Sequence, residues 1–188
     1  DADRLWYLKR EVANTLQQAI SAPQGPVHLN VPLREPLYHT DEKWPSGERV
    51  VKHLLPKAQL SDSQWKQLAT GWQQAKKIFV VIGATAPADL DKASLQQLHE
   101  AGAVILAEHI ANAPFASVIS SFDALLYQMP EEVKEDYMPD LLIYAGRDLV
   151  SKRLKQFLRQ AQPEAVWAVD EAPEAADTFK NLSLHIRM

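Results

Sequence analysis

Two adjacent basic residues, Lys152 and Arg153, are the residues best placed for chemistry in this sequence. They stand in the first turn of an expected helix, where the positive end of the helix dipole makes a cation mildly unfavourable. The same position suits an anion, because amide groups and basic side chains both attract carboxylate or phosphate. We therefore predict that Lys152 and Arg153 bind an anionic ligand. The alternative is that both side chains are simply solvated.

The stretch from Asp140 to Leu158 contains the elements that must position this pair. Its apolar run at 141–145 does not alternate with polar residues, which indicates a buried parallel strand. Residues 147–149 are too few for anything but a tight strand-to-helix connection. The expected helix carries five apolar residues on one face: Val150, Leu154, Phe157, Leu158 and Ala161. Ser151 could bond a ligand through its hydroxyl, but its position favours a helix cap.

Strands and helices are expected to alternate along the chain. Expected strands cover residues 27–31, 78–82, 103–107, 141–145, 166–169 and 182–186. Expected helices cover residues 4–20, 61–75, 89–101 and 121–128, and residues 131–137 are expected to form a turn or loop. Ser61 and Gln64 have the spacing of a capping box, and Trp65 and Trp72 are expected in the core. The prediction is an α/β fold with a Rossmann-like, doubly wound, mainly parallel sheet of about five strands.

The composition narrows the possible classes of protein. The 188 residues carry a net charge of −4, which argues against nucleic-acid binding. No apolar run has the length of a membrane span, so no membrane insertion is expected. The absence of cysteine excludes a disulfide scaffold, a thiolate nucleophile and cysteine metal ligands, and it fits a cytoplasmic protein.

Two folding units are expected. Residues 34–56 contain several prolines and charges without a sustained hydrophobic period, which indicates a linker.

The last expected strand, 182–186, alternates polar and apolar residues and is therefore expected at a sheet edge. The chain begins at Asp1 within an expected helix and without methionine, so we expect it to be a piece of a longer protein.

Neither a nucleotide site nor a metal site is indicated. The turn after residues 78–82 has Gly83 but no G-x-G-x-x-G pattern, and no P-loop is present. The histidines are scattered, without the spacing of metal ligands. His109 and Asn112, in the loop after residues 103–107, could face a ligand cleft, although a hydrogen-bonded loop histidine is the simpler interpretation.

Residues 25–38, GPVHLNVPLREPLY, resemble the end of the first domain in one family of thiamine-diphosphate enzymes. These are the 2-succinyl-5-enolpyruvyl-6-hydroxy-3-cyclohexene-1-carboxylate synthases of menaquinone biosynthesis. The resemblance implies three α/β units, which are pyrimidine-binding, middle and pyrophosphate-binding domains. It implies that residues 1–38 are the last helix and strand of the pyrimidine-binding domain, 39–60 the linker and 61–188 the Rossmann-like middle domain.

The family also has a G-x-x-x-x-[SG]-K-R-L pattern whose basic pair reaches toward substrate carboxylates. Residues 146–154, GRDLVSKRL, match this pattern at every position. The resemblance therefore implies that Lys152 and Arg153 bind the polycarboxylate substrates, 2-oxoglutarate and isochorismate, with Ser151 close by. A planar arginine and a point-charge lysine suit such ligands. The loop at 108–114 departs from the run usual in the family.

The same resemblance implies a transferase that uses thiamine diphosphate with Mg²⁺ or Mn²⁺ and works as a homodimer or homotetramer together with its two remaining domains. The family's G-D-G…N motif and its catalytic glutamate are absent from these residues. The fragment by itself is therefore expected to bind no cofactor and to be inactive. Two other functions stay open: a regulatory module that binds a small anion at Lys152 and Arg153, and a structural spacer between the neighbouring domains.

Overall fold

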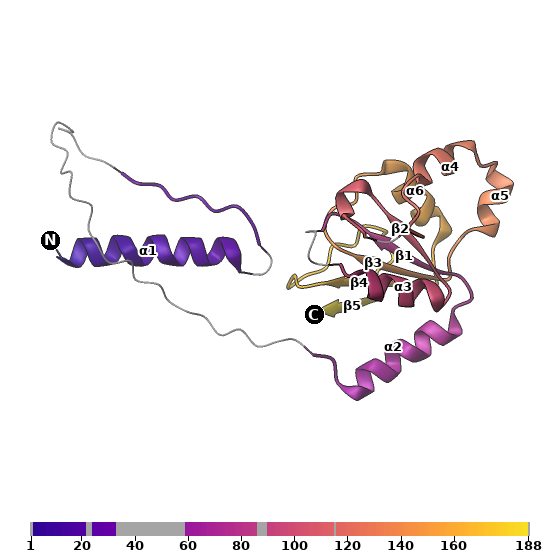
Figure 1. Cartoon of the computed structure of the whole chain (residues 1–188), viewed down its shortest axis with the longest axis horizontal. Helices are drawn as coiled ribbons and strands as arrows, with labels where there is room; N and C mark the ends of the chain where they lie inside the picture. The colour runs from indigo at the N-terminus through magenta and orange to yellow at the C-terminus, as the bar shows by residue number, and fades with distance from the viewer. Residues whose placement is uncertain (1, 22–23, 33–58, 86–89, 115, 188) are drawn as a thin grey trace. The chain divides into compact units, whose positions relative to one another are not determined.

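The computed structural model describes residues 2–21, 24–32, 59–85, 90–114 and 116–187, and it contains two units, 1–56 and 57–188. In the first unit, α1 (Ala2–Ile20) confirms the expected helix and is followed by an extended segment (Figure 1). The strand expected at 27–31 is wrong. This segment is exposed and pairs with no other described segment, and an extended chain becomes a strand only when a neighbour accepts its hydrogen bonds. The expected linker at 39–60 falls almost wholly outside the described residues.

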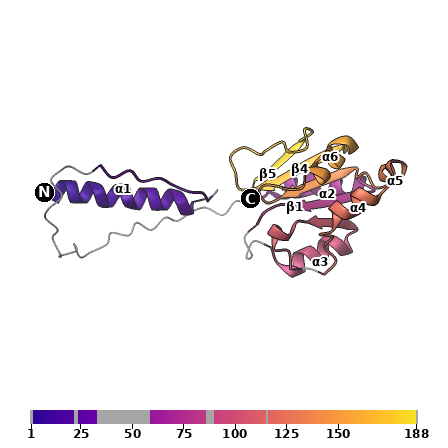
Figure 2. The same ribbon diagram turned by 90° about the horizontal axis from the view of Figure 1, so that it is seen from above.

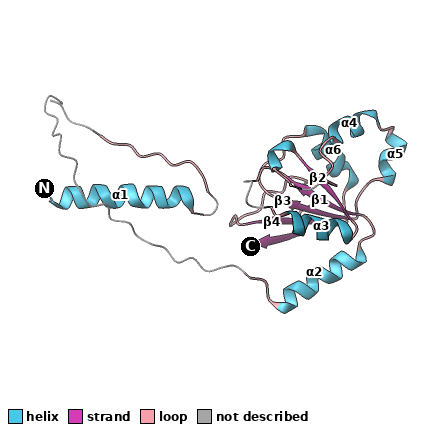
Figure 3. Cartoon of the chain, in the orientation of Figure 1, coloured by secondary structure: helices cyan, strands magenta, loops and turns pink. Residues whose placement is uncertain are grey.

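The second unit alternates helices and strands, as Figure 3 shows by colour. Its strands are β1 (Ile78–Ile82), β2 (Ala103–Ala107), β3 (Leu141–Ala145), β4 (Ala165–Asp170) and β5 (Leu184–Arg187). Its helices are α2 (Asp62–Gln74), α3 (Lys92–Glu100), α4 (Phe122–Gln128), α5 (Glu131–Asp136) and α6 (Lys152–Ala161), with a 3-10 turn η1 (His109–Ala111). In the described residues no helix is both long and apolar enough to cross a membrane.

All five strands are parallel, in the order β2-β1-β3-β4-β5. β5 therefore lies at an edge, as its alternating sequence predicts, and Figure 2 shows β4 and β5 on the side of the sheet away from α3. The chain leaves β1 for β2 in one direction and continues from β3 to β4 and β5 in the other. The carboxyl ends of β1 and β3 thus meet where the strand order reverses, which is the place where open α/β sheets bind ligands.

The strands are apolar on both sides because helices cover both faces of the sheet. On one face, α4 and α6 pack through residues such as Leu126 and Leu158 against Val81 and Leu142 (Figure 1). On the other face, α2 and α3 pack against a second cluster that includes Val80. Of the residues named here, Val81, Leu142 and Leu158 are completely buried. The fold prediction is confirmed, with a sheet that is entirely parallel.

Three local expectations are wrong. Val150 is 66% exposed and lies before α6, while its neighbour Leu149 is buried in its place, because the helix begins only after Ser151. Residues 131–136 form the short helix α5 instead of a turn, and Lys134 bonds Glu131 one turn earlier. Trp65 is 53% exposed, since α2 contacts the core through three later residues. These are Leu68, Trp72 and Ala75.

Candidate anion-binding site

The turns that follow β1 and β3 are hydrogen-bonded to each other at the carboxyl edge of the sheet. The Ala84 amide donates to the Asp148 carbonyl at 3.1 Å, and the Arg147 amide donates to the Ala84 carbonyl at 2.8 Å. A Cβ built on Gly83 would overlap the carbonyl oxygen of Arg147 and lie 2.9 Å from the Tyr144 hydroxyl. Gly83 is therefore needed for this close approach. The lone glycine that provides no nucleotide signature serves to join the two turns.

Tyr144, at the end of β3, supports the same connection from inside. Its hydroxyl donates a hydrogen bond to the Arg147 carbonyl, and its ring meets Phe179 edge to face at 5.4 Å between centroids. Burial raises the pKa of Tyr144 to about 12, with smaller contributions from the negative charges of Asp148, Glu108 and Asp170. The phenol is therefore a neutral donor that keeps the β3–α6 loop in place.

Ser151 is the N-cap residue just before α6 and is the one buried polar residue of the described core. Its Oγ accepts a hydrogen bond from the Leu154 amide at 3.0 Å and donates one to Asp123 Oδ1 at 2.6 Å. The first bond confirms the predicted helix cap. The second joins α6 to the first turn of α4. With both interactions made inside the protein, a contact between Ser151 and substrate stays a prediction.

The carboxylate of Glu108 occupies the amides just before α6. Glu108 follows β2, and its two oxygens accept from the Val150 amide at 2.8 Å and from the Ser151 amide at 2.5 Å. Sequence reasoning missed both Glu108 and Asp123. The available signal was the position of Glu108, an acidic residue directly after a parallel strand and so on the ligand-binding edge. Because Glu108 already uses these two amides, they are not open to an incoming anion.

Lys152 and Arg153 are exposed at the first two positions of α6. The guanidinium of Arg153 donates to the Asp123 carbonyl at 3.3 Å and lies 5.1 Å from the centre of the Tyr127 ring, so α4 steadies it. Lys152 instead lines a surface hollow with other residues of α6. These are Lys155, Gln156, Arg159 and Gln160. The two cations therefore have different neighbours, and a ligand with two separated carboxylates suits them better than a single small anion does.

The weaker candidates, His109 and Asn112, lie in and just after η1. The side-chain amide of Asn112 donates to the Thr85 carbonyl at 3.0 Å and to the Ile110 carbonyl at 3.2 Å, and its backbone has a φ of 51°. Thr85 in turn donates through its hydroxyl to the Ala111 carbonyl. Asn112 thus ties the loop after β2 to the turn after β1. His109 is exposed beside it, and a role for either residue in substrate binding stays a prediction.

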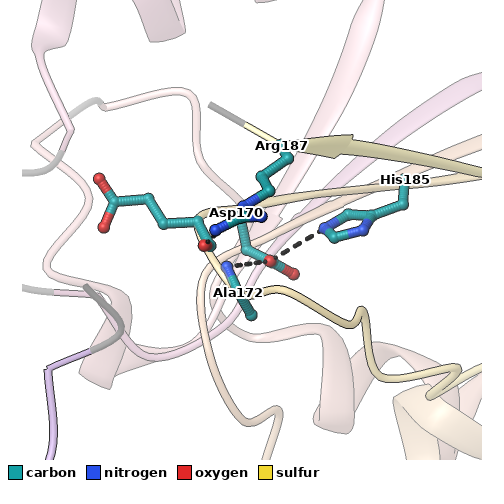
Figure 4. A network of polar contacts seen from close by, with 5 residues as sticks. Asp170, Ala172, His185 and Arg187 are labelled. Carbon is teal, nitrogen blue, oxygen red and sulfur yellow. Dashed lines mark hydrogen bonds and ion pairs between the residues drawn. The ribbon is translucent and has the colours of Figure 1, made fainter. Parts of the chain in front are cut away.

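A separate polar network lies at the carboxyl ends of β4 and β5, and β5 is an edge strand of the sheet (Figure 4). Asp170 Oδ1 accepts from the Ala172 amide at 2.8 Å and lies 3.1 Å from His185 Nε2. Arg187 donates to the Glu171 carbonyl at 3.3 Å. Each of these contacts joins β5 to the end of β4 or closes the turn after it, so the network secures the last strand.

The cofactor implied by the resemblance does not fit this set of residues. Among the described residues, no group of three histidine, aspartate or glutamate side chains is arranged to hold a metal ion. The turn after β1 is closed by the 146–148 backbone, which leaves no glycine-lined approach for a pyrophosphate. We therefore derive no step through thiamine diphosphate or its metal from these residues.

Comparison with known proteins agrees with the fold. The family model for the middle domain of thiamine pyrophosphate enzymes matches residues 40–186. Several curated proteins named 2-succinyl-5-enolpyruvyl-6-hydroxy-3-cyclohexene-1-carboxylate synthase are similar. The protein of Porphyromonas gingivalis is 33% identical over 182 residues, covering 96% of this chain and 31% of its own length.

Two further synthases with this name give similar figures. The protein of Cytophaga hutchinsonii is 34% identical, covering 96% of this chain and 32% of its own length. The protein of Bacteroides thetaiotaomicron is 32% identical, covering 97% of this chain and 33% of its own length. The chain thus spans about a third of the length of these relatives. The family model covers most of the chain, including the whole parallel sheet except its last residue. The chain therefore belongs to the family of thiamine pyrophosphate enzyme middle domains.

Proposed function

We propose that this chain is the central part of a 2-succinyl-5-enolpyruvyl-6-hydroxy-3-cyclohexene-1-carboxylate synthase. Such a transferase removes carbon dioxide from 2-oxoglutarate and adds the remaining succinic-semialdehyde unit to isochorismate. The relatives that carry this name align over nearly all of the chain, which supports the proposal. Within this function, residues 1–38 would close the pyrimidine-binding domain, 39–60 would form the linker and 61–188 the middle domain.

The part that we assign to this chain is recognition of substrate carboxylates by Lys152 and Arg153. The observation that carries this assignment is the position of the pair, exposed at the start of α6 and beside the point where the strand order of the sheet reverses. Arg153 is steadied over α4, so its guanidinium loses less freedom when it binds a carboxylate. Ser151 holds the start of the helix, and His109 and Asn112 are weaker candidates for contact.

The complete enzyme would use thiamine diphosphate with Mg²⁺ or Mn²⁺, which supplies the electron sink for decarboxylation. We place the binding of cofactor and metal in the pyrimidine-binding and pyrophosphate-binding domains of the complete enzyme, and propose that the enzyme works as a homodimer or homotetramer. The chain by itself is expected to turn over neither substrate. Purified alone, it should release no carbon dioxide from 2-oxoglutarate even when cofactor and metal are added, and measurable turnover would contradict this.

Lys152→Ala and Arg153→Ala in the complete enzyme test the assignment. If the pair binds substrate carboxylates, each change should raise the KM for 2-oxoglutarate or isochorismate about tenfold or more, the usual effect of losing a charged hydrogen bond. Arg153→Lys should restore only part of the loss, because lysine cannot make a planar two-point contact. The matched control is Lys66→Ala on α2, an exposed lysine on the opposite face of the sheet.

The same variants separate the other two functions. A regulatory module that binds a small anion would keep its KM and kcat but lose modulation by that anion. The hollow lined by Lys152, Lys155 and Arg159 is the feature that favours this second candidate. A structural spacer would lose neither property. Unchanged kinetics in both variants would therefore remove substrate recognition from this chain.

A further inference from the structure

Glu108 connects two loops that are far apart in the sequence and adjacent at the carboxyl edge of the sheet. It directly follows β2, while Val150 and Ser151, whose amides it accepts, stand 42 and 43 residues later, just before α6. Each carboxylate oxygen takes one amide, at 2.8 and 2.5 Å. The Glu108 amide in turn donates to the Ile82 carbonyl at 3.4 Å, at the end of β1. One residue therefore joins the ends of β1 and β2 to the start of α6.

The energetics of this contact favour a negative charge in this place. The start of a helix carries the positive end of the dipole, and an ionised carboxylate that accepts from backbone amides makes hydrogen bonds roughly twice as strong as neutral ones. Ser151 is only 7% exposed, so water competes poorly for its amide. Asp123 holds the same residue from the other side through the Ser151 hydroxyl, at 2.6 Å. The residue before Lys152 is thus held by two carboxylates.

We propose that Glu108 is a positioning residue for substrate binding, which acts by serving as an internal carboxylate on the Val150 and Ser151 amides. In this role it sets the direction in which the first turn of α6 presents Lys152 and Arg153. It also occupies those two amides, so that they do not bind a substrate carboxylate. This inference rests on the proposed function of Lys152 and Arg153 and names a residue that touches neither substrate nor cofactor.

The test uses the complete enzyme with Glu108→Ala and Glu108→Gln. Glu108→Ala should raise the KM for the substrate that Lys152 and Arg153 bind by about ten- to hundredfold, the effect of displacing a binding group by a fraction of an ångström to one ångström. The kcat should change less than the KM. Glu108→Gln keeps the size of the side chain and one acceptor oxygen, so its KM should fall between wild type and Glu108→Ala. It also guards against a failure of Glu108→Ala to fold.

Chemical rescue distinguishes positioning from general damage. In Glu108→Ala, added formate can accept hydrogen bonds from the two amides that Glu108 has vacated. Because such a small anion binds weakly, a formate concentration on the order of 50–100 mM should be needed, and it should lower the raised KM about threefold or more. The same concentration of chloride should not, and formate should not lower the KM of wild type. The matched control variant is Glu100→Ala, an exposed glutamate on α3 whose side chain accepts a hydrogen bond from Gln96 of the same helix. It should leave the KM unchanged.

The outcomes separate this inference from the function on which it rests. If Lys152→Ala and Arg153→Ala raise the KM but Glu108→Ala does not, positioning by Glu108 is overturned and the proposed function stands. A raised KM in Glu108→Ala that formate fails to lower also overturns it. If neither Lys152→Ala nor Arg153→Ala changes the KM, substrate recognition by this pair is overturned, and positioning by Glu108 is overturned with it. Hydrogen exchange gives a readout that does not depend on activity: the Val150 and Ser151 amides should lose protection in Glu108→Ala and regain it with formate.

Discussion

The hydroxyl of Ser151 lies 2.6 Å from the carboxylate of Asp123 and donates to it while it accepts from the Leu154 amide, so one buried side chain both caps α6 and joins it to α4. Ser151 and Asp123 are 28 residues apart in the chain. The bond brings the first turns of the two helices together on the face of the sheet that carries the apolar cluster of Val81, Leu142 and Leu158. The start of α6 is therefore held by tertiary contacts as well as by its own cap.

Removal of this hydroxyl should be more costly than removal of an ordinary cap. Ser151→Ala loses the cap and leaves the Asp123 carboxylate without its donor, so it should lower the free energy of unfolding by about 2 kcal/mol. Ser61→Ala removes the exposed cap of α2 and should cost about 0.5–1 kcal/mol. Urea unfolding followed by circular dichroism measures both. Equal losses would show that the bond to Asp123 adds nothing.

Gly83 allows the turns after β1 and β3 to touch. In Gly83→Ala the new methyl would overlap the Arg147 carbonyl, a backbone atom that cannot move aside cheaply, so the free energy of unfolding should fall by about 2–3 kcal/mol. Gly102 is the matched comparison, since it has a φ of +92° but no atom within 4 Å of an added Cβ. Gly102→Ala should therefore cost only its backbone strain, about 1 kcal/mol.

The Gly83 variant should also disturb the candidate site, whereas the Gly102 variant should not. Gly102 lies in the turn between α3 and β2, at the amino end of the sheet. In the complete enzyme, the KM should rise in Gly83→Ala and stay constant in Gly102→Ala. A Gly83→Ala enzyme with unchanged KM and stability would contradict the proposed contact between the turns.

The sequence alone predicts the sheet well because each strand is a short, uninterrupted apolar run. Runs such as 78–82 and 141–145 need to be buried on both sides, and helices between them leave only a parallel sheet as a solution. The strand expected at 27–31 shows the limit of this reasoning. Its composition suits a strand, but strand formation depends on a neighbouring strand, which local sequence does not reveal.

The sequence predicts where the two cations and the helix cap of the candidate site lie, but it does not predict which carboxylates reach them. Lys152, Arg153 and Ser151 are adjacent, so a single helix start places all three. Glu108 and Asp123 reach the same place from 43 and 28 residues away, through the strand order and the packing of α4 on α6. Such contacts are properties of the tertiary structure. They also change the interpretation, since the two amides just before α6 already bind Glu108.

His185 and Asp170 form a half-buried pair that links β5 to β4, with Nε2 and Oδ1 3.1 Å apart. A double-mutant cycle with His185→Ala and Asp170→Ala should give a coupling of about 0.5 kcal/mol, because such pairs are partly screened by solvent. Asp170→Ala alone should cost more than His185→Ala alone, since Asp170 also accepts from the Ala172 amide. Equal single-mutant losses would contradict this second role.

Stability at alkaline pH should depend on Tyr144. Its pKa in the folded protein is about 12, raised from an ordinary value of 10.0 chiefly by burial. Below pH 10 the phenol is neutral in both the folded and the unfolded chain, so its stabilising contribution is complete. As the pH rises from 10 toward 12 the unfolded chain ionises first, and the free energy of unfolding should fall.

Tyr144→Phe isolates this effect. The variant should be less stable than wild type by about 1 kcal/mol at pH 8, because the Arg147 carbonyl loses its donor. Between pH 10 and 11.5 it should lose less stability than wild type does, because phenylalanine has no proton to release. Tyr127→Phe is the control, since Tyr127 is 75% exposed. Urea unfolding at several pH values gives the free energy of unfolding against pH for wild type and both variants. Parallel curves for wild type and Tyr144→Phe would show that the buried phenol does not govern alkaline unfolding.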